Sequence, residues 1–167
     1  ITNNEPKIFG QLILSKYKPA YQNLITLDGN HMKKYLQMSF LNRLDEVIEI
    51  YNIHLTSNQQ SNSDKKRHDQ LTQLFNEIKE NKVIIAGDFN SDDKMEYDQF
   101  QDTWENLRSD EEGFTFDYIE NGLTSKTTRS FIRTRIDKIL YKNLKPNNIE
   151  LGFNEPINNI WPSDHFG

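Results

Sequence analysis

The chain has 167 residues, the size of one domain, and contains no cysteine, which excludes disulfide bonds and thiolate metal sites. Its net charge of −5 at pH 7 does not indicate a broad basic surface for nucleic acid, although binding a phosphate locally needs no such surface. No apolar run approaches the roughly 20 residues of a membrane span. The first residues also lack the basic and apolar regions of a signal peptide. We therefore expect an intracellular protein, in the nucleus or cytoplasm, without a membrane partner.

The first third of the chain predicts strands. Residues 8–16 predict a strand, and residues 17–30 predict a connecting loop because they contain turn-forming Pro, Asp and Gly. Two further strands are expected at residues 31–40 and 46–54, joined by a hairpin turn at residues 42–45. The second of these is the best candidate for a central strand.

A helix is expected over residues 64–80, with Asp64 as its N-cap. Four apolar side chains recur at helical spacing and predict one buried stripe: Leu71, Leu74, Phe75 and Ile78. A short buried strand at residues 83–86 follows. The segment from residue 46 onward therefore predicts a strand–helix–strand unit.

The last third predicts shorter elements. We expect a short helix within residues 98–107, a strand or loop at 114–117, and a mobile segment at 122–130. Strands are expected at residues 132–141 and 148–152. No second domain is indicated.

Acidic and amide side chains follow the strand at residues 83–86. After Gly87 come Asp88 and Asn90, which are two residues apart and would point the same way in an extended chain. A carboxylate and an amide aimed at one point suit a hard cation beside a phosphate. The alternative is an Asp/Asn turn that merely closes the strand.

Three more motifs accompany this one in chain order. A strand ends on His54, the RIDKIL segment contains Asp137, and a Ser-Asp-His segment ends at His165. The ordered set resembles the endonuclease/exonuclease/phosphatase superfamily. That resemblance implies a metal-dependent phosphoesterase with an α/β (α+β) fold, a four-layer sandwich of two packed β-sheets flanked by helices.

The resemblance is confined to the later part of the family's domain. We therefore expect residues 1–167 to form a single partial domain that lacks the first half and the last strand. The family's metal-binding Glu belongs to the first half. The isolated 167-residue chain is expected to be inactive, and an assembly partner could supply or cover the missing half.

The resemblance implies a role for each motif residue. Asp88 would aid the metal site and position the attacking water, and Asn90 would hydrogen-bond that water or the phosphate. Asp137 would accept a hydrogen bond from the imidazole of His165, and His54 would bind the phosphate. The expected ligands of Mg²⁺ or Mn²⁺ are Asp88, Asn90, Asp164 and His165. The expected substrate contacts are Thr56, Ser57 and Phe116.

Structural alternatives remain open for several of these residues. The hydroxyls of Thr56 and Ser57 could merely close a turn. Asp137 could be a strand residue that pairs with Arg133 or Arg135. His54 could be a half-buried structural histidine.

Several segments narrow the resemblance to the 5′-tyrosyl-DNA phosphodiesterase branch: residues 102–105, 113–117, 135–140 and 149–167. The resemblance to this branch implies hydrolysis of nucleic-acid phosphoesters, with DNA that carries a 5′ adduct as the partner. One alternative function is a non-catalytic structural or interaction subunit on the same fold. A second is a phosphatase of small phosphorylated molecules.

Overall fold

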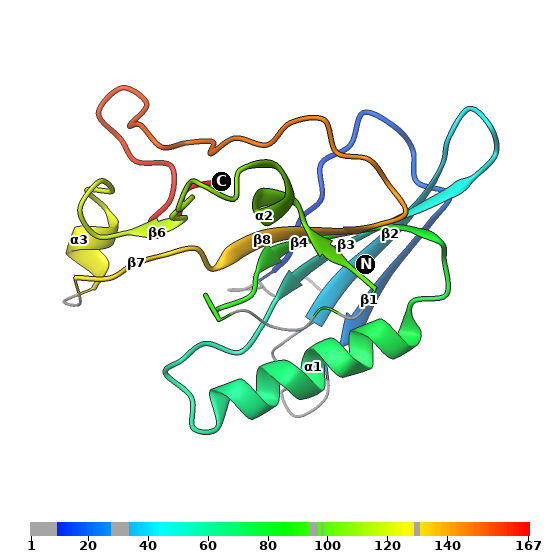
Figure 1. Cartoon of the computed structure of the whole chain (residues 1–167), viewed down its shortest axis with the longest axis horizontal. Helices are drawn as coiled ribbons and strands as arrows, with labels where there is room; N and C mark the ends of the chain where they lie inside the picture. The colour runs from blue at the N-terminus through cyan, green and yellow to red at the C-terminus, as the bar shows by residue number, and fades with distance from the viewer. Residues whose placement is uncertain (1–9, 28–33, 94–96, 98, 129–130) are drawn as a thin grey trace, which may run out of the picture.

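The computed structural model describes residues 10–27, 34–93, 97, 99–128 and 131–167 (Figure 1). They form a mixed α/β fold, as predicted, built on a sheet of six strands and a smaller sheet of two. The six strands are β1 (Tyr21–Thr26), β2 (Lys34–Leu41), β3 (Val47–His54), β4 (Lys82–Asp88), β5 (Gln101–Asp102) and β8 (Asp137–Lys142). The two short strands are β6 (Phe116–Asp117) and β7 (Arg133–Thr134), and the helices are α1 (Ser63–Glu77), α2 (Thr103–Leu107) and α3 (Thr124–Thr127).

The order of strands in the large sheet brings the motif-bearing segments together. Strands run β1-β2-β3-β4-β8-β5, with β3 and β4 parallel and the other neighbours antiparallel. The crossover from β3 to β4 is helix α1, so the predicted strand–helix–strand unit is confirmed. Strand β3 is an interior strand, as expected, and β2 and β3 form the predicted hairpin.

Helix α1 covers one face of the large sheet (Figure 1). Its predicted apolar stripe packs there, with Leu71, Leu74 and Ile78 buried in the core cluster and Phe75 partly buried against it. The ring of Phe75 stacks on Phe100 at 5.0 Å between centroids. Each fully buried side chain of this kind contributes about 1.5–3 kcal/mol relative to an exposed one. This core holds α1 against the β3–β4 pair.

The predictions near the N-terminus need correction. The described part of the strand expected at residues 8–16 contains no strand, and β1 lies inside the expected loop at residues 17–30. Strand β1 is an edge strand with mostly exposed side chains, so its hydrophobic alternation is weak. Residues 31–33 of the next predicted strand lie outside the described residues.

The start of α1 also differs from the prediction. Its N-cap is Asn62, in the left-handed region at φ 55° and without a side-chain cap hydrogen bond. Asp64 instead lies in the first turn, where its carboxylate accepts a hydrogen bond from Arg67. The helix ends at Glu77, three residues before the predicted end at residue 80.

The strand expected at residues 132–141 is divided into β7 and β8. Between them, the guanidinium of Arg135 binds Asp102 and the amide of Ile136 donates to the Thr115 hydroxyl. These side-chain contacts replace strand pairing.

No strand forms at residues 148–152, and the segment expected to be mobile contains α3 in its described part. The helix expected within residues 98–107 is α2, while residue 98 lies outside the described residues.

None of the helices in the described part of the chain is both long and apolar enough to span a bilayer.

Candidate active site

The parallel pairing of β3 and β4 places two of the predicted residues side by side. His54 and Asp88 end their strands as register partners. The His54 Nε2 and Asp88 Oδ2 atoms are 3.4 Å apart. The strand topology therefore brings these two side chains together at the ends of β3 and β4.

A tight turn after β4 fixes the carboxylate of Asp88. Asn90 has a left-handed φ of 53°, and its backbone N–H donates to Asp88 Oδ1 at 2.7 Å. Its side-chain amide donates to Asp88 Oδ2 at 2.9 Å and to the Leu55 carbonyl at 3.1 Å. The Asp/Asn turn considered from sequence is thus present, and the same turn orients the carboxylate and ties it to the end of β3.

Strand β8 brings a second carboxylate to the strand ends where His54 and Asp88 lie. Asp137 is the antiparallel register partner of Asp88, and its Oδ2 lies 2.8 Å from His165 Nδ1. The predicted Asp137–His165 contact is confirmed. The alternative partners are engaged elsewhere, since Arg133 binds Asp117 and Arg135 binds Asp102.

The surroundings of His165 favour its charged form. Partial burial acts to lower the imidazole pKa, but the hydrogen bond that the imidazole donates to Asp137 and the charges of Asp137, Asp88 and Asp164 outweigh it. The net result is a pKa raised above the ordinary histidine value of 6.5. A histidine in this setting can donate to a phosphate oxygen.

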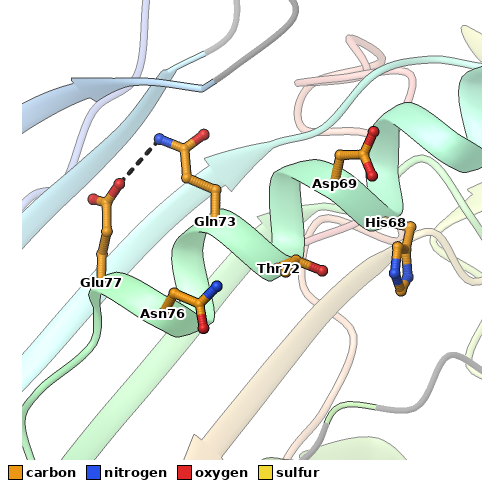
Figure 2. A pocket seen from close by; sticks show the side chains of 6 residues that line it. All are labelled: His68, Asp69, Thr72, Gln73, Asn76 and Glu77. Carbon is orange, nitrogen blue, oxygen red and sulfur yellow. Dashed lines mark hydrogen bonds between the residues drawn. The ribbon is translucent and has the colours of Figure 1, made fainter.

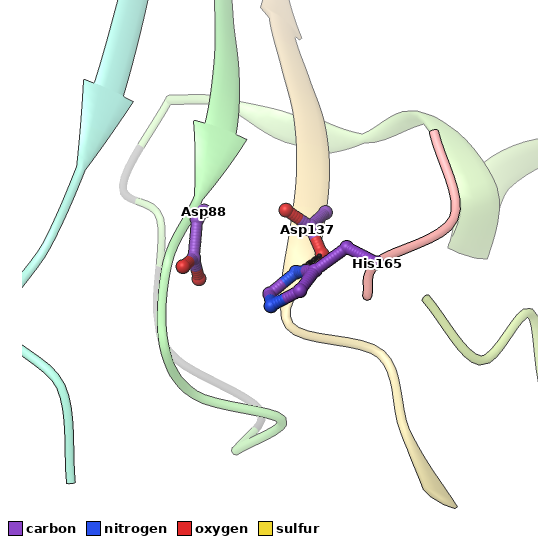
Figure 3. Close-up of side chains that lie close together, drawn as sticks. All are labelled: Asp88, Asp137 and His165. Atoms are coloured by element: carbon purple, nitrogen blue, oxygen red, sulfur yellow. Dashed lines mark hydrogen bonds and ion pairs between the residues drawn. The ribbon is translucent and has the colours of Figure 1, made fainter. Parts of the chain in front are cut away.

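Three side chains converge at this edge of the sheet (Figure 3). Ligand atoms of Asp88, Asp137 and His165 all lie within 4.8 Å of one another. The two carboxylates are of the type that a divalent cation binds, whereas a charged His165 has no lone pair for a metal and suits the role of a donor. The predicted ligand set omitted Asp137.

Another predicted ligand, Asp164, is placed differently. Its carboxylate accepts a hydrogen bond from the Thr127 hydroxyl at 3.4 Å, and its carbonyl accepts one from Thr124. It is not among the three side chains that converge in the described part of the chain. Its charge nevertheless acts on His165.

The expected substrate contacts divide into two groups. The Phe116 ring meets the His165 ring edge-on, with centroids 5.0 Å apart, and so borders the cluster. Thr56 is fully buried, and its hydroxyl accepts from Gln70 at 3.0 Å. Ser57 is partly exposed, and its carbonyl accepts from the Gln60 amide in a turn. The structure thus places Phe116 beside the cluster, while the buried Thr56 fastens α1 to the end of β3.

Sequence analysis missed the side chains that fasten the His165 loop. Asn121 is fully buried, and its amide donates to the Ser163 carbonyl at 3.1 Å. Thr124 reaches the Asp164 carbonyl from α3. These are isolated polar residues in a segment without apolar periodicity, so no pattern in the sequence marks them.

Of two cavities among the described residues, one lies away from the cluster and one borders it. A shallow depression of about 440 Å³ along α1 is lined by Asp69, Gln73, Glu77 and neighbouring side chains (Figure 2). All of these belong to one helix and none belongs to the cluster, so we assign it no catalytic role. A second cavity of about 250 Å³ has Asp137 and Thr115 among its lining residues, and it borders the cluster.

The raised pKa of His165 predicts how stability changes with pH. The folded-state pKa of His165 lies above the unfolded value. The contribution of charged His165 to the free energy of unfolding is therefore complete below the unfolded pKa, and it is lost as pH rises through the folded pKa. Unfolding free energies from urea titrations of the native protein should therefore fall more between about pH 6 and about pH 9 than those of Asp137→Asn. Equal losses in the two proteins would contradict this assignment.

Two carboxylates and a histidine gathered at the strand ends of a mixed sheet define a candidate site for acid–base or metal-assisted chemistry. The chain belongs to the Endonuclease/Exonuclease/phosphatase family, whose sequence profile matches residues 3–165. A search of curated proteins found no relative that matches the chain.

Solved structures with the same fold include two TDP2 proteins. The chain is 23% identical to D. rerio TDP2 complexed with single-strand DNA product, with a TM-score of 0.73, covering 89% of this chain and 65% of that one. It is 19% identical to truncated Caenorhabditis elegans TDP2, with a TM-score of 0.70, covering 89% and 63%. A family protein from Leptotrichia buccalis is 21% identical, with a TM-score of 0.64, covering 90% and 60%. The chain thus spans less than two thirds of each of these proteins.

Proposed function

We propose that this chain forms the later part of a divalent-metal-dependent phosphodiesterase that hydrolyses phosphoester bonds of nucleic acid. Its nearest type is a 5′-tyrosyl-DNA phosphodiesterase, with Mg²⁺ or Mn²⁺ as the cofactor. The observation that carries the proposal is the convergence of Asp88, Asp137 and His165 at one edge of the sheet, with His54 beside them. The likeness in fold to TDP2 with a DNA product supports the choice of substrate.

Hydrolysis of a phosphodiester needs an oriented water, neutralised oxyanion charge and in-line geometry. A divalent cation held by Asp88 would act as a Lewis acid on the phosphate. The Asp88 carboxylate, fixed by the two hydrogen bonds from Asn90, would accept a hydrogen bond from the attacking water. That water would form the new bond to phosphorus and release a proton to Asp88 as the bond to the leaving oxygen breaks.

The histidines would act on the phosphate oxygens. Asp137 holds Nδ1 of His165, which leaves Nε2 as the ring nitrogen that can donate to a phosphate oxygen. His54 would add a second donor from the end of β3. The aromatic ring of Phe116 beside His165 offers a surface on which a nucleobase could stack.

A competition panel tests the substrate class. The native protein is assayed with Mg²⁺ on a 5′-tyrosyl oligonucleotide while unmodified oligonucleotide, nucleotides or inositol phosphates compete. We expect the tyrosyl oligonucleotide to be cleaved and the small phosphates to compete poorly. Efficient cleavage of the small phosphates alone would instead identify a small-molecule phosphatase, and no cleavage of any compound would favour a non-catalytic subunit.

A further inference from the structure

The side chain of Thr115 lies just before β6 and is almost fully buried, with an exposed fraction of 5%. We propose that Thr115 is a positioning residue that sets the hydrogen bond between Asp137 and His165. It touches neither a reacting atom nor a substrate in this proposal, and it acts only through that pair. The catalytic part of the inference rests on the proposed function.

The Thr115 hydroxyl fixes the start of β8. Its Oγ1 accepts hydrogen bonds from the backbone N–H of Ile136 at 3.1 Å and of Asp137 at 3.0 Å. These amides lie where the chain has left β7 and has just entered β8. The hydroxyl therefore helps to fix the Asp137 backbone at the start of β8, together with the pairing of β8 with β4.

The Thr115 backbone fixes the other partner. Its carbonyl accepts from the N–H of Phe166, the residue after His165, at 2.7 Å. Its own N–H donates to the Thr134 carbonyl at 3.1 Å, which anchors Thr115 to the small sheet. One residue thus contacts the segments that carry both members of the pair.

This connection matters because Asp137 and His165 are far apart in the chain. Their hydrogen bond joins residues 28 positions apart, and His165 comes from a loop without regular secondary structure. Asn121 and Thr124 hold the loop itself, whereas Thr115 relates the loop to Asp137. Replacing the hydroxyl by a methyl group leaves the Ile136 and Asp137 amides without this acceptor. Because Thr115 is buried, the loss of these hydrogen bonds is costly.

The test compares Thr115→Val, which keeps the side-chain shape, with Thr115→Ser, which keeps the hydroxyl. In the native protein acting on a 5′-tyrosyl oligonucleotide with Mg²⁺, we expect Thr115→Val to lower kcat roughly 10- to 100-fold. The KM should change much less, and Thr115→Ser should restore most of kcat. Adding Thr115→Val to Asp137→Asn should cause no further loss, because both changes remove the same interaction.

Thr134→Val is the matched control. Thr134 is also buried beside Thr115, but its hydroxyl has no hydrogen-bond partner within the described part of the chain. This change should leave kcat unaltered. Equal kcat values for Thr115→Val and Thr134→Val, or a Thr115→Ser protein as impaired as Thr115→Val, would overturn the proposal.

Amide hydrogen exchange separates this inference from the proposed function. The Ile136 and Asp137 amides should exchange faster in Thr115→Val than in Thr115→Ser or Thr134→Val, whether or not the protein hydrolyses any substrate. If the wild-type protein is inactive, the proposed function fails and exchange alone decides the positioning role. Unchanged exchange in Thr115→Val would refute that role.

Discussion

Replacing Asp88 by asparagine in the native protein should reduce hydrolysis of a 5′-tyrosyl oligonucleotide at least about 100-fold. Asparagine keeps the size of the side chain but removes the charge that would hold a divalent cation and orient the water. The amide of Asn90 would also lose a carboxylate acceptor. Steady-state kinetics with Mg²⁺ in excess measure the effect, which should appear in kcat.

His165→Ala should cause a loss of similar size, since it removes a donor to the phosphate and leaves Asp137 without its partner. Helix α1 supplies matched controls in the exposed side chains of His68 and Asp69. His68→Ala and Asp69→Asn make the same chemical changes away from the cluster and should retain full activity. If Asp88→Asn or His165→Ala retained the activity of its control, the cluster would not be the catalytic site.

Gly87→Ala should destabilise the protein by about 3 kcal/mol or more. Gly87 has a φ of 138°, and an added Cβ would lie 2.1 Å from the Ile53 carbonyl oxygen. That oxygen belongs to the neighbouring strand of the parallel pair, so relief requires β3 and β4 to separate. The separation would also move His54 away from Asp88.

The unfolding free energy from urea titration measures this effect, and Gly10→Ala provides the control. A Cβ added at Gly10 meets no atom of the described residues within 4 Å. The control should therefore unfold within about 0.5 kcal/mol of wild type. A Gly87→Ala protein as stable as Gly10→Ala would mean that Gly87 does not lie close against the Ile53 carbonyl of β3.

Hydrophobic pattern predicted the part of the fold that positions the site. The apolar stripe of α1 and the buried strand before Asp88 define a strand–helix–strand unit, and its parallel pairing places His54 opposite Asp88. The Asp137–His165 contact came from the family resemblance, because nothing in the local pattern relates residues so distant in sequence. The roles of these residues stay predictions until activity is measured.

The sequence pattern gave wrong or no predictions for the edge strand of the sheet and for residues that make buried polar contacts. Strand β1 is exposed, so turn-forming residues around it masked its pairing with β2. Thr56 follows a motif histidine and looked like a phosphate ligand, yet α1 buries it through Gln70. Thr115 lies in the segment expected to be a strand or loop, and nothing in its sequence context indicates that its hydroxyl accepts hydrogen bonds from the Ile136 and Asp137 amides.

Metal dependence tests the central claim most directly. The native protein is stripped of metal with a chelator, assayed on a 5′-tyrosyl oligonucleotide, and assayed again after Mg²⁺ or Mn²⁺ is restored. The account predicts loss of hydrolysis on chelation and recovery on restoring the metal, with no recovery for Asp88→Asn. Hydrolysis that persists after chelation, or that recovers equally in Asp88→Asn, would contradict it.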